Sequence, residues 1–233
     1  MHNLRLASLL SFVAGIVNIT GVLAIKVLTT NITGHFAYFS EDIFTGNYQV
    51  ATIYLVFVFA FLLGAFLSSF LIELVPQKFE SYASTLPLII EISILCAVGL
   101  WGMPSSLLDR HGQYISCAML FAMGMQNALV TKVSQSVVRT THLTGLFTDL
   151  GIEISQWFFY REATHRSRLL KSILLKLSII GGFFLGCLLG GMVYKTMELK
   201  TLLVSAGTLV FTLFYDTIRM RYYHLKRKIQ SWQ

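Results

Sequence analysis

The chain has 233 residues, of which 55% are hydrophobic and 12% are charged, with a mean hydropathy of +0.68. This composition is too apolar for a soluble domain of this length and places the chain in a lipid bilayer. The formal net charge of +7 comes from basic residues that flank apolar runs, which argues against nucleic acid as a partner.

We expect an all-α polytopic membrane protein, because helices satisfy their own backbone hydrogen bonds inside lipid. Six apolar runs are each about long enough for the ~20 residues that cross a bilayer. They lie at 4–28, 50–75, 86–104, 112–131, 172–194 and 201–217. The first run is interpreted as a retained span, because it is longer than the apolar region of a signal peptide and lacks a small-residue cleavage pattern.

A short pattern follows both the first and the fourth run. Residues 29–36 read T-T-N-I-T-G-H-F, and residues 140–147 read T-T-H-L-T-G-L-F, 111 positions further on. Apolar residues then recur at i, i+4, i+7 and i+11 in both places, which predicts one apolar face of an α-helix. We therefore expect two T-G helices, at 30–46 and 141–158, that are amphipathic or half-spanning.

Further matches predict that the chain is a duplication of one unit. The matching segments are Gly15 to Asn18 with Gly124 to Asn127, and Phe61 to Gly64 with Phe183 to Gly186. The predicted parts are a first repeat at 1–105, a second repeat at 106–217 and a basic tail at 218–233.

The T-G helices decide the topology. If they do not cross the membrane, each half has three spans and the halves are inverted. If they cross, there are eight spans and the repeat is parallel. The inverted layout is favoured, since carboxylates on the T-G helices are costly in lipid. The basic segments predict a cytoplasmic location for both termini.

These motifs resemble the YoaK-like family of bacterial membrane proteins, which is defined by sequence and has no assigned function. The resemblance rests on Gly15 to Asn18, Thr33 to Gly34, Gly124 to Ala128, Thr140 to Gly145 and Thr148 to Gly151. Two positions depart from the family pattern: His35 stands where Asn is usual, and Asn18 stands where an acid is usual. The resemblance implies the bacterial cytoplasmic (inner) membrane and a presumption of transport.

The start of each T-G helix is a candidate binding site. Hydroxyls, amides and free N–H groups at a helix N-terminus suit an anion such as a carboxylate or phosphate. The candidate substrate-binding residues are Thr30, Asn31, Thr33, Gly34, Thr141, His142, Thr144, Gly145, Asn18 and Asn127, with Lys26 and Arg139 to attract charge. The structural alternative is that the Thr-Gly pairs allow close helix packing and the threonines bond their own backbone.

Ionisable residues follow on the polar face of each T-G helix and in the third apolar run. The candidates for coupling transport to protons or cations are His35, Asp42, Asp149, Glu153 and Glu91. Histidine titrates near neutral pH, and an ionisable group at membrane depth is a functional candidate. The alternative is that the T-G helices lie flat at the membrane surface with their polar faces in water.

Motifs of hydrolases, metalloproteases, P-loop enzymes and dinucleotide-binding enzymes do not occur in the sequence, so neither a catalytic residue nor a cofactor is expected. Cys96, Cys117 and Cys187 lie in apolar runs without metal-ligand spacing and are interpreted as packed thiols.

The sequence predicts a carrier for a small polar solute, an anion among the candidates, with a site at the interface of the two repeats. The alternative is a non-transporting membrane scaffold. It would bind anionic lipids or a partner through the basic loop at 160–171 and the tail.

Overall fold

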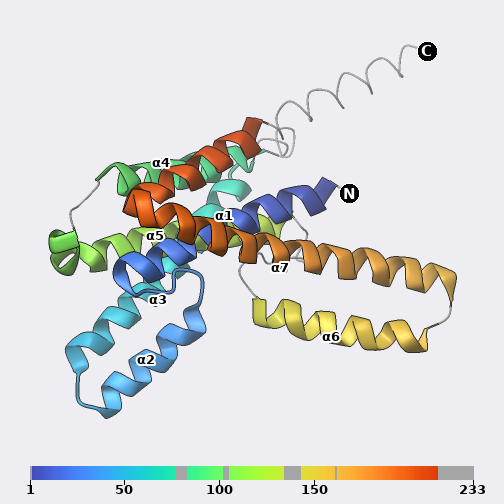
Figure 1. Ribbon diagram of the computed structural model, residues 1–233, viewed down its shortest axis with the longest axis horizontal. Coiled ribbons are helices and arrows are strands. Elements are labelled where there is room, and N and C mark those ends of the chain that lie inside the picture. The colour runs from blue at the N-terminus through green and yellow to red at the C-terminus, as the bar shows by residue number, and fades with distance from the viewer. Residues whose placement is uncertain (1, 77–82, 102–104, 134–142, 161, 215–233) are drawn as a thin grey trace.

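The computed structural model describes residues 2–76, 83–101, 105–133, 143–160 and 162–214. Within these ranges every regular element is a helix, which confirms the all-α prediction for this part of the chain (Figure 1). The helices are α1 (His2–Ile25), α2 (Ile32–Phe44), α3 (Tyr48–Glu73), α4 (Thr85–Trp101), α5 (Ser105–Val133), α6 (Leu143–Phe159) and α7 (Ala163–Met197). The 3-10 turn η2 (Glu198–Lys200) and helical residues 201–214 follow.

Among the described residues, four helical stretches are long and apolar enough to cross a membrane: Leu6–Ile25, Tyr48–Glu73, His111–Lys132 and the 51-residue stretch Thr164–Phe214. The last contains α7, η2 and residues 201–214. Helix α4 is a shorter apolar helix of 17 residues, about 26 Å long at 1.5 Å per residue. This is the architecture of a helical membrane protein, and the number of six spans stays a prediction.

One predicted loop is wrong. The sequence predicts a basic loop at 160–171, but α7 begins at Ala163 and continues without interruption into the apolar part. The stretch contains neither Pro nor Gly, and Arg, Leu and Lys are strong helix formers. The helix therefore extends past the point where the apolar pattern stops.

Helices α1 and α7 touch at glycines. A Cβ added to Gly15 would lie 2.2 Å from the carbonyl oxygen of Phe183, and a Cβ added to Gly186 would lie 2.1 Å from the carbonyl oxygen of Phe12. No side chain fits at such distances. The glycines therefore let the two backbones approach more closely than any other residue would.

Helices α3 and α5 make the same contact. A Cβ on Gly64 would lie 2.0 Å from the carbonyl oxygen of Phe121, and one on Gly124 would lie 2.1 Å from that of Phe61. The two glycines and Phe61 lie in the segments that match those of the α1–α7 contact in the sequence comparison of the two halves. These glycines are close-packing residues, while the duplication of the chain stays a prediction.

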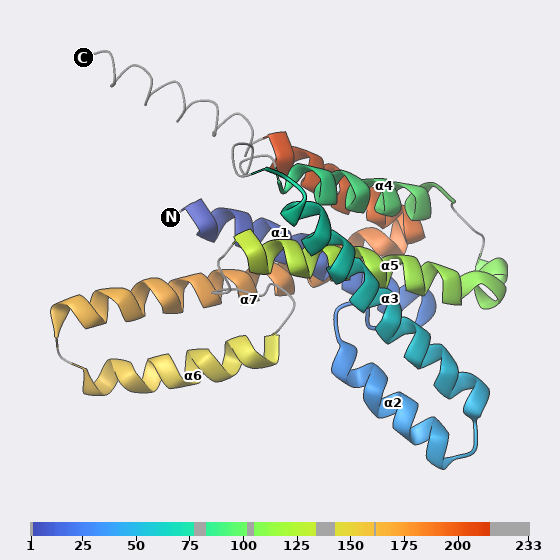
Figure 2. The ribbon, with the colours of Figure 1, turned by 180° about the vertical axis from the view of Figure 1, so that it is seen from behind.

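Helix α1 runs in the direction of α7 and opposite to α5 (Figures 1 and 2). Its end at Ile25 lies against Gly112, in the first part of α5, and Gly21 lies against Met119 further along α5. Two hairpins, α2 with the start of α3 and α6 with the first half of α7, extend from this core in different directions.

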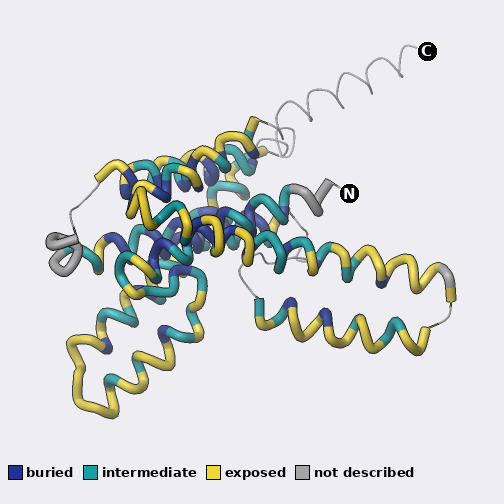
Figure 3. Tube along the Cα trace, in the orientation of Figure 1, coloured by how far each residue is buried: buried dark blue, intermediate teal, exposed yellow. Residues whose placement is uncertain are grey.

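Buried residues gather where α1, α5 and α7 meet, and the two hairpins are largely exposed (Figure 3). The fully buried core includes Val13, Ala14, Val17, Met119, Met123 and Ile179. Large apolar side chains on the hairpins, such as Phe44 and Phe159, are exposed. Exposed apolar surface of this extent is what a helical membrane protein presents to lipid.

Replacing a contact glycine should destabilise the fold. We expect Gly64→Ala and Gly186→Ala each to lower the free energy of unfolding by about 1–3 kcal/mol, because the added methyl group collides with a backbone carbonyl. Thermal unfolding in detergent measures the effect. Gly181→Ala and Gly207→Ala are matched controls, since a Cβ there has nothing within 4 Å. Equal stability of all four variants would contradict the packing described here.

Candidate functional site

The first T-G block forms a turn that ties α2 to α1. Helix α1 ends because Lys26 adopts a φ of 57°, in the left-handed region that often terminates helices. The chain then turns back, and Thr30 Oγ1 donates a hydrogen bond of 3.0 Å to Asn18 Oδ1 in α1. Two predicted binding residues are thus brought together, and they bind each other.

Asn31 caps helix α2. Its backbone is extended, with φ −120° and ψ 95°, and its side-chain oxygen accepts a hydrogen bond of 3.1 Å from the N–H of Gly34. This is the usual role of Asn at a helix N-cap. The observation supports the structural alternative at this position, since the helix itself uses the group that was expected to bind a solute. Thr33 is exposed beside it.

His35 is buried between α2 and the turn before it, with an exposed fraction of 2%. Its Nε2–H donates to the carbonyl oxygen of Leu28 at 2.8 Å, and its ring packs on Tyr54 and Phe57. Burial lowers the pKa of His35 below its ordinary value, and the bond to Leu28 opposes that shift. The ring is therefore neutral at neutral pH and anchors α2 to α3.

The carboxylates of the T-G helices occupy different surroundings. Asp42 lies at the α2–α3 turn, where the side-chain amide of Asn47 approaches its Oδ1 at 3.4 Å. Asp149 is exposed on α6. Neither lies among the buried residues of the core, so the structure does not gather these acids into one interior site.

Glu153 forms a buried polar cluster between α6 and α7. Its Oε1 accepts hydrogen bonds of 2.7 Å from both Lys176 Nζ and Ser172 Oγ, and Lys176 Nζ lies 2.9 Å from Ser172 Oγ. The side chains of Lys176 and Glu153 are 10% and 17% exposed. We did not predict Lys176 or Ser172 as site residues, although a lone lysine inside the 172–194 apolar run is a signal that points to a site.

Among the buried side chains of the described residues that have unpaired polar atoms, two carry a pair of such atoms each. Glu91 in α4 and Gln126 in α5 are both 0% exposed. Neither the two carboxylate oxygens of Glu91 nor the amide oxygen and nitrogen of Gln126 have a hydrogen-bond partner in the described structure. Buried polar groups are normally paired, and exceptions ask for an explanation. Gln126 was missed because it lies within an apolar run as one uncharged residue.

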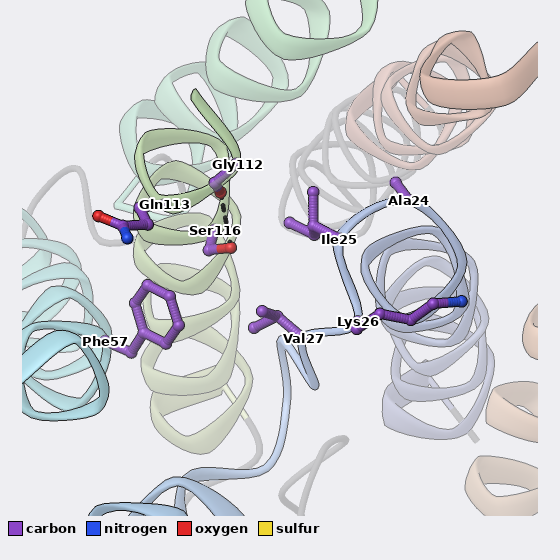
Figure 4. Close-up of a pocket in the computed structure, with 8 residues that line it drawn as sticks. All are labelled: Ala24, Ile25, Lys26, Val27, Phe57, Gly112, Gln113 and Ser116. Carbon is purple, nitrogen blue, oxygen red and sulfur yellow. Dashed lines mark hydrogen bonds between the residues drawn. The ribbon is translucent and has the colours of Figure 1, made fainter. Parts of the chain in front are cut away.

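A cavity of about 370 Å³ lies at the end of α1 (Figure 4). Phe57, Ile25 and Val27 point into it, and Ser116 lines it from α5. The side chain of Lys26 points away from this space. Polar and apolar atoms contribute about equally to the lining of the cavity, which also includes Gln113, and the side chain of the cation expected to attract an anionic solute does not face it.

The second T-G block is only partly described. Thr144 is exposed at the start of α6, Gly145 follows it, and Asn127 is half-buried in α5. Three predicted residues, Arg139, Thr141 and His142, lie outside the described residues, as does the tail at 218–233. Helices α2 and α6 belong to separate hairpins, so the structure does not bring the described parts of the two blocks together (Figure 2). Within the described ranges, no group of three or more His, Cys, Asp or Glu residues is placed to hold a metal ion.

Comparison with known proteins identifies the family. The model of a family described as "Protein of unknown function (DUF1275)" matches residues 6–215, so the chain belongs to this family. No curated protein and no solved structure matches the chain. The finer resemblance to YoaK-like proteins stays a prediction.

Breaking the Glu153–Lys176 pair should release α6 from α7. We expect Lys176→Met to destabilise this hairpin by about 3 kcal/mol, because it leaves a buried carboxylate without its cation. Hydrogen exchange of the α6 amides measures the loss. The double variant Glu153→Leu with Lys176→Met should regain most of the protection, since it leaves no unpaired charge. If the double variant exchanged as fast as the single one, the pair would not be what holds α6.

Proposed function

We propose that this member of the family is a membrane carrier for a small polar solute, an anion among the candidates, built from two inverted repeats. The observation that carries the proposal is the pair of equivalent glycine contacts. The α1–α7 and α3–α5 contacts use matching residues, and each joins one helix from each half of the chain. Equivalent contacts between the two halves are expected when two copies of one unit are related by a twofold axis.

The direction of the helices favours the inverted layout. The antiparallel arrangement of α1 and α5, which are repeat equivalents, fits an axis in the plane of the membrane. In this layout α1, α3 and α4 cross in the first half, and α5, α7 and residues 201–214 cross in the second. Inverted repeats are a common plan of secondary transporters, so this architecture supports a carrier.

The same layout gives the T-G blocks a role at the two ends of the molecule. The first block follows the end of α1, and the second follows α5, which runs the other way. Each block would then lie near a different face of the membrane, as part of an outer or an inner gate. The chain would sit in the bacterial cytoplasmic membrane with both termini in the cytoplasm.

The solute path would use the polar groups buried in the core. Gln126 supplies an amide with a free donor and a free acceptor, and Glu91 supplies a carboxyl. Unpaired polar groups in an apolar bundle are costly, and their retention is typical of sites that bind a substrate or an ion. Asp42, Asp149 and Glu153 would act at the hairpins, where Glu153 already holds Lys176.

A second candidate is the non-transporting scaffold. Its supporting observation is the basic first part of α7, where Arg168 and Lys171 are exposed. Arg166 is also exposed and lies 4.4 Å over the ring of Trp157. Basic side chains beside an aromatic ring suit the headgroup region of anionic lipids.

Uptake into proteoliposomes tests the carrier. The full chain would be offered labelled phosphate, small monocarboxylates, dicarboxylates and amino acids, with protein-free liposomes as the blank. We expect saturable uptake of one of these classes, and we expect Gln126→Leu to reduce it at least tenfold. That variant should fold as well as the wild type or better, because it removes two unpaired polar atoms.

Ser93→Ala is the matched control, since the Ser93 hydroxyl bonds only the carbonyl oxygen of Ile89 in its own helix and lies on the exposed face of α4. It should transport normally. Absence of uptake for every class offered, together with binding of the chain in neutral nanodiscs to anionic but not to neutral liposomes, would favour the scaffold instead.

A further inference from the structure

We propose that Glu91 is a proton-binding carboxyl in the interior of the bundle, one that a lipophilic carbodiimide modifies and a water-soluble one does not reach. The protonated state follows from the surroundings of the side chain alone. The further step, that this proton is the coupling ion of transport, rests on the proposed function.

The position of Glu91 is the first argument. It is the seventh of the 17 residues of α4, and its neighbours in sequence are Ile90 and Ile92. Leu88 and Leu95, one turn away on either side, are buried in the hydrophobic core. The carboxyl group therefore lies within the apolar part of the helix and not at an end from which it reaches water.

The absence of partners is the second argument. Glu91 is 0% exposed, and neither carboxylate oxygen has a hydrogen-bond partner among the described residues. A bare carboxylate in such a place would lose its hydration without compensation. A carboxylic acid carries no net charge and loses far less, so the neutral, proton-bound form is the one that fits this site.

No ionisable group of the neighbouring elements is described as a hydrogen-bond partner of Glu91. Helix α4 packs against α3, α5 and η2, and a Cβ on Gly99 would meet Leu203 in the last helical segment. The described ionisable groups on these elements are Tyr48, Tyr54 and Glu73 on α3, His111, Tyr114, Cys117 and Lys132 on α5, and Glu198 and Lys200 on η2. Lys132 is engaged with Glu73. Residues 201–214 carry no ionisable side chain.

The same surroundings favour a proton over a metal cation. Sodium and divalent ions require several oxygen ligands at one point. Glu91 has no hydrogen-bond partner in the described structure, and no described cluster of three or more acidic, His or Cys residues includes it. A proton needs one carboxyl group and no further ligand.

The reaction with a carbodiimide reports this state directly. The carboxylic acid adds across one C=N bond of the reagent: its proton goes to nitrogen and its oxygen bonds to the central carbon, giving an O-acylisourea. The acyl group then moves from oxygen to nitrogen and gives a stable N-acylurea. Nothing leaves and nothing is oxidised, so the peptide gains the mass of one reagent molecule.

The test uses the full chain in phosphatidylcholine liposomes, treated with dicyclohexylcarbodiimide and analysed by peptide mass spectrometry. We expect the adduct on Glu91 and at least tenfold less on the exposed Asp149. A water-soluble carbodiimide with an added amine should show the reverse preference. Reaction of Glu91 with the water-soluble reagent, or no reaction with the lipophilic one, would overturn the proposal.

Glu91→Gln is the matched variant, because glutamine has nearly the same shape and is neutral. It should unfold at the wild-type temperature, lose the adduct and lose the infrared band of a protonated carboxyl. A lower unfolding temperature would show instead that a charged Glu91 supports the fold, which would contradict the proposal.

A second arm separates this inference from the proposed function. In proteoliposomes with a transported solute, Glu91→Gln should lose accumulation driven by a pH gradient at least tenfold and keep exchange of solute without a gradient. If the adduct forms and no solute is transported, the carrier fails and the proton-binding carboxyl stands. If the variant accumulates solute like the wild type, the coupling role of Glu91 is refuted.

Discussion

The close contact between a glycine of one helix and a backbone carbonyl of another is the constraint on which the rest of this structure depends. Moving an apolar side chain from lipid into the protein interior releases little free energy. Helices in a membrane therefore associate through tight packing and polar contacts. Gly15 and Gly186 join α1 to α7, and Gly64 and Gly124 join α3 to α5. Because these backbones touch, the angle and the register of both pairs are fixed. The positions of α4, the last helical segment and the two hairpins follow from that core.

The two hairpins are held by different chemistry. In the first, the neutral ring of His35 bonds the carbonyl oxygen of Leu28 and packs on aromatic rings. In the second, the charged pair of Glu153 and Lys176 joins α6 to α7. A few polar contacts hold each hairpin, whereas backbone packing along whole helices holds the core. Local opening is therefore easier at the hairpins than in the core, and because their contacts differ, the two will not open under the same conditions.

The sequence predicts the helices well because they follow from local apolar patterns, and it marks the contact glycines as members of matched segments without showing that they pack. The apolar face predicted around Thr33 locates α2 to within two residues at each end. The matched segments contain the glycines that pack. What it does not predict depends on three-dimensional neighbours. The Asn31 side chain accepts a hydrogen bond from its own helix, and Lys176 pairs with an acid of another helix. No local pattern in the sequence shows that the Gln126 amide has no partner in the described structure. The start of α7 is predicted wrongly because hydropathy shows which residues lie in the membrane. It does not show where the helix itself begins.

The glycine contacts also decide which parts of the molecule are able to move as units. Sliding α7 along α1 by one residue would bring a side chain against the carbonyl oxygen of Phe12, where only glycine fits. Each pair is therefore locked lengthwise, and α1 with α7 forms one rigid body while α3 with α5 forms another. Neither body coincides with a half of the sequence, since each takes one helix from either side of the midpoint. The chain leaves the first body after Ile25 and reaches the second through the turn that ends at the N-cap Asn31 and through α2, so a motion of one body relative to the other would bend the chain in that turn.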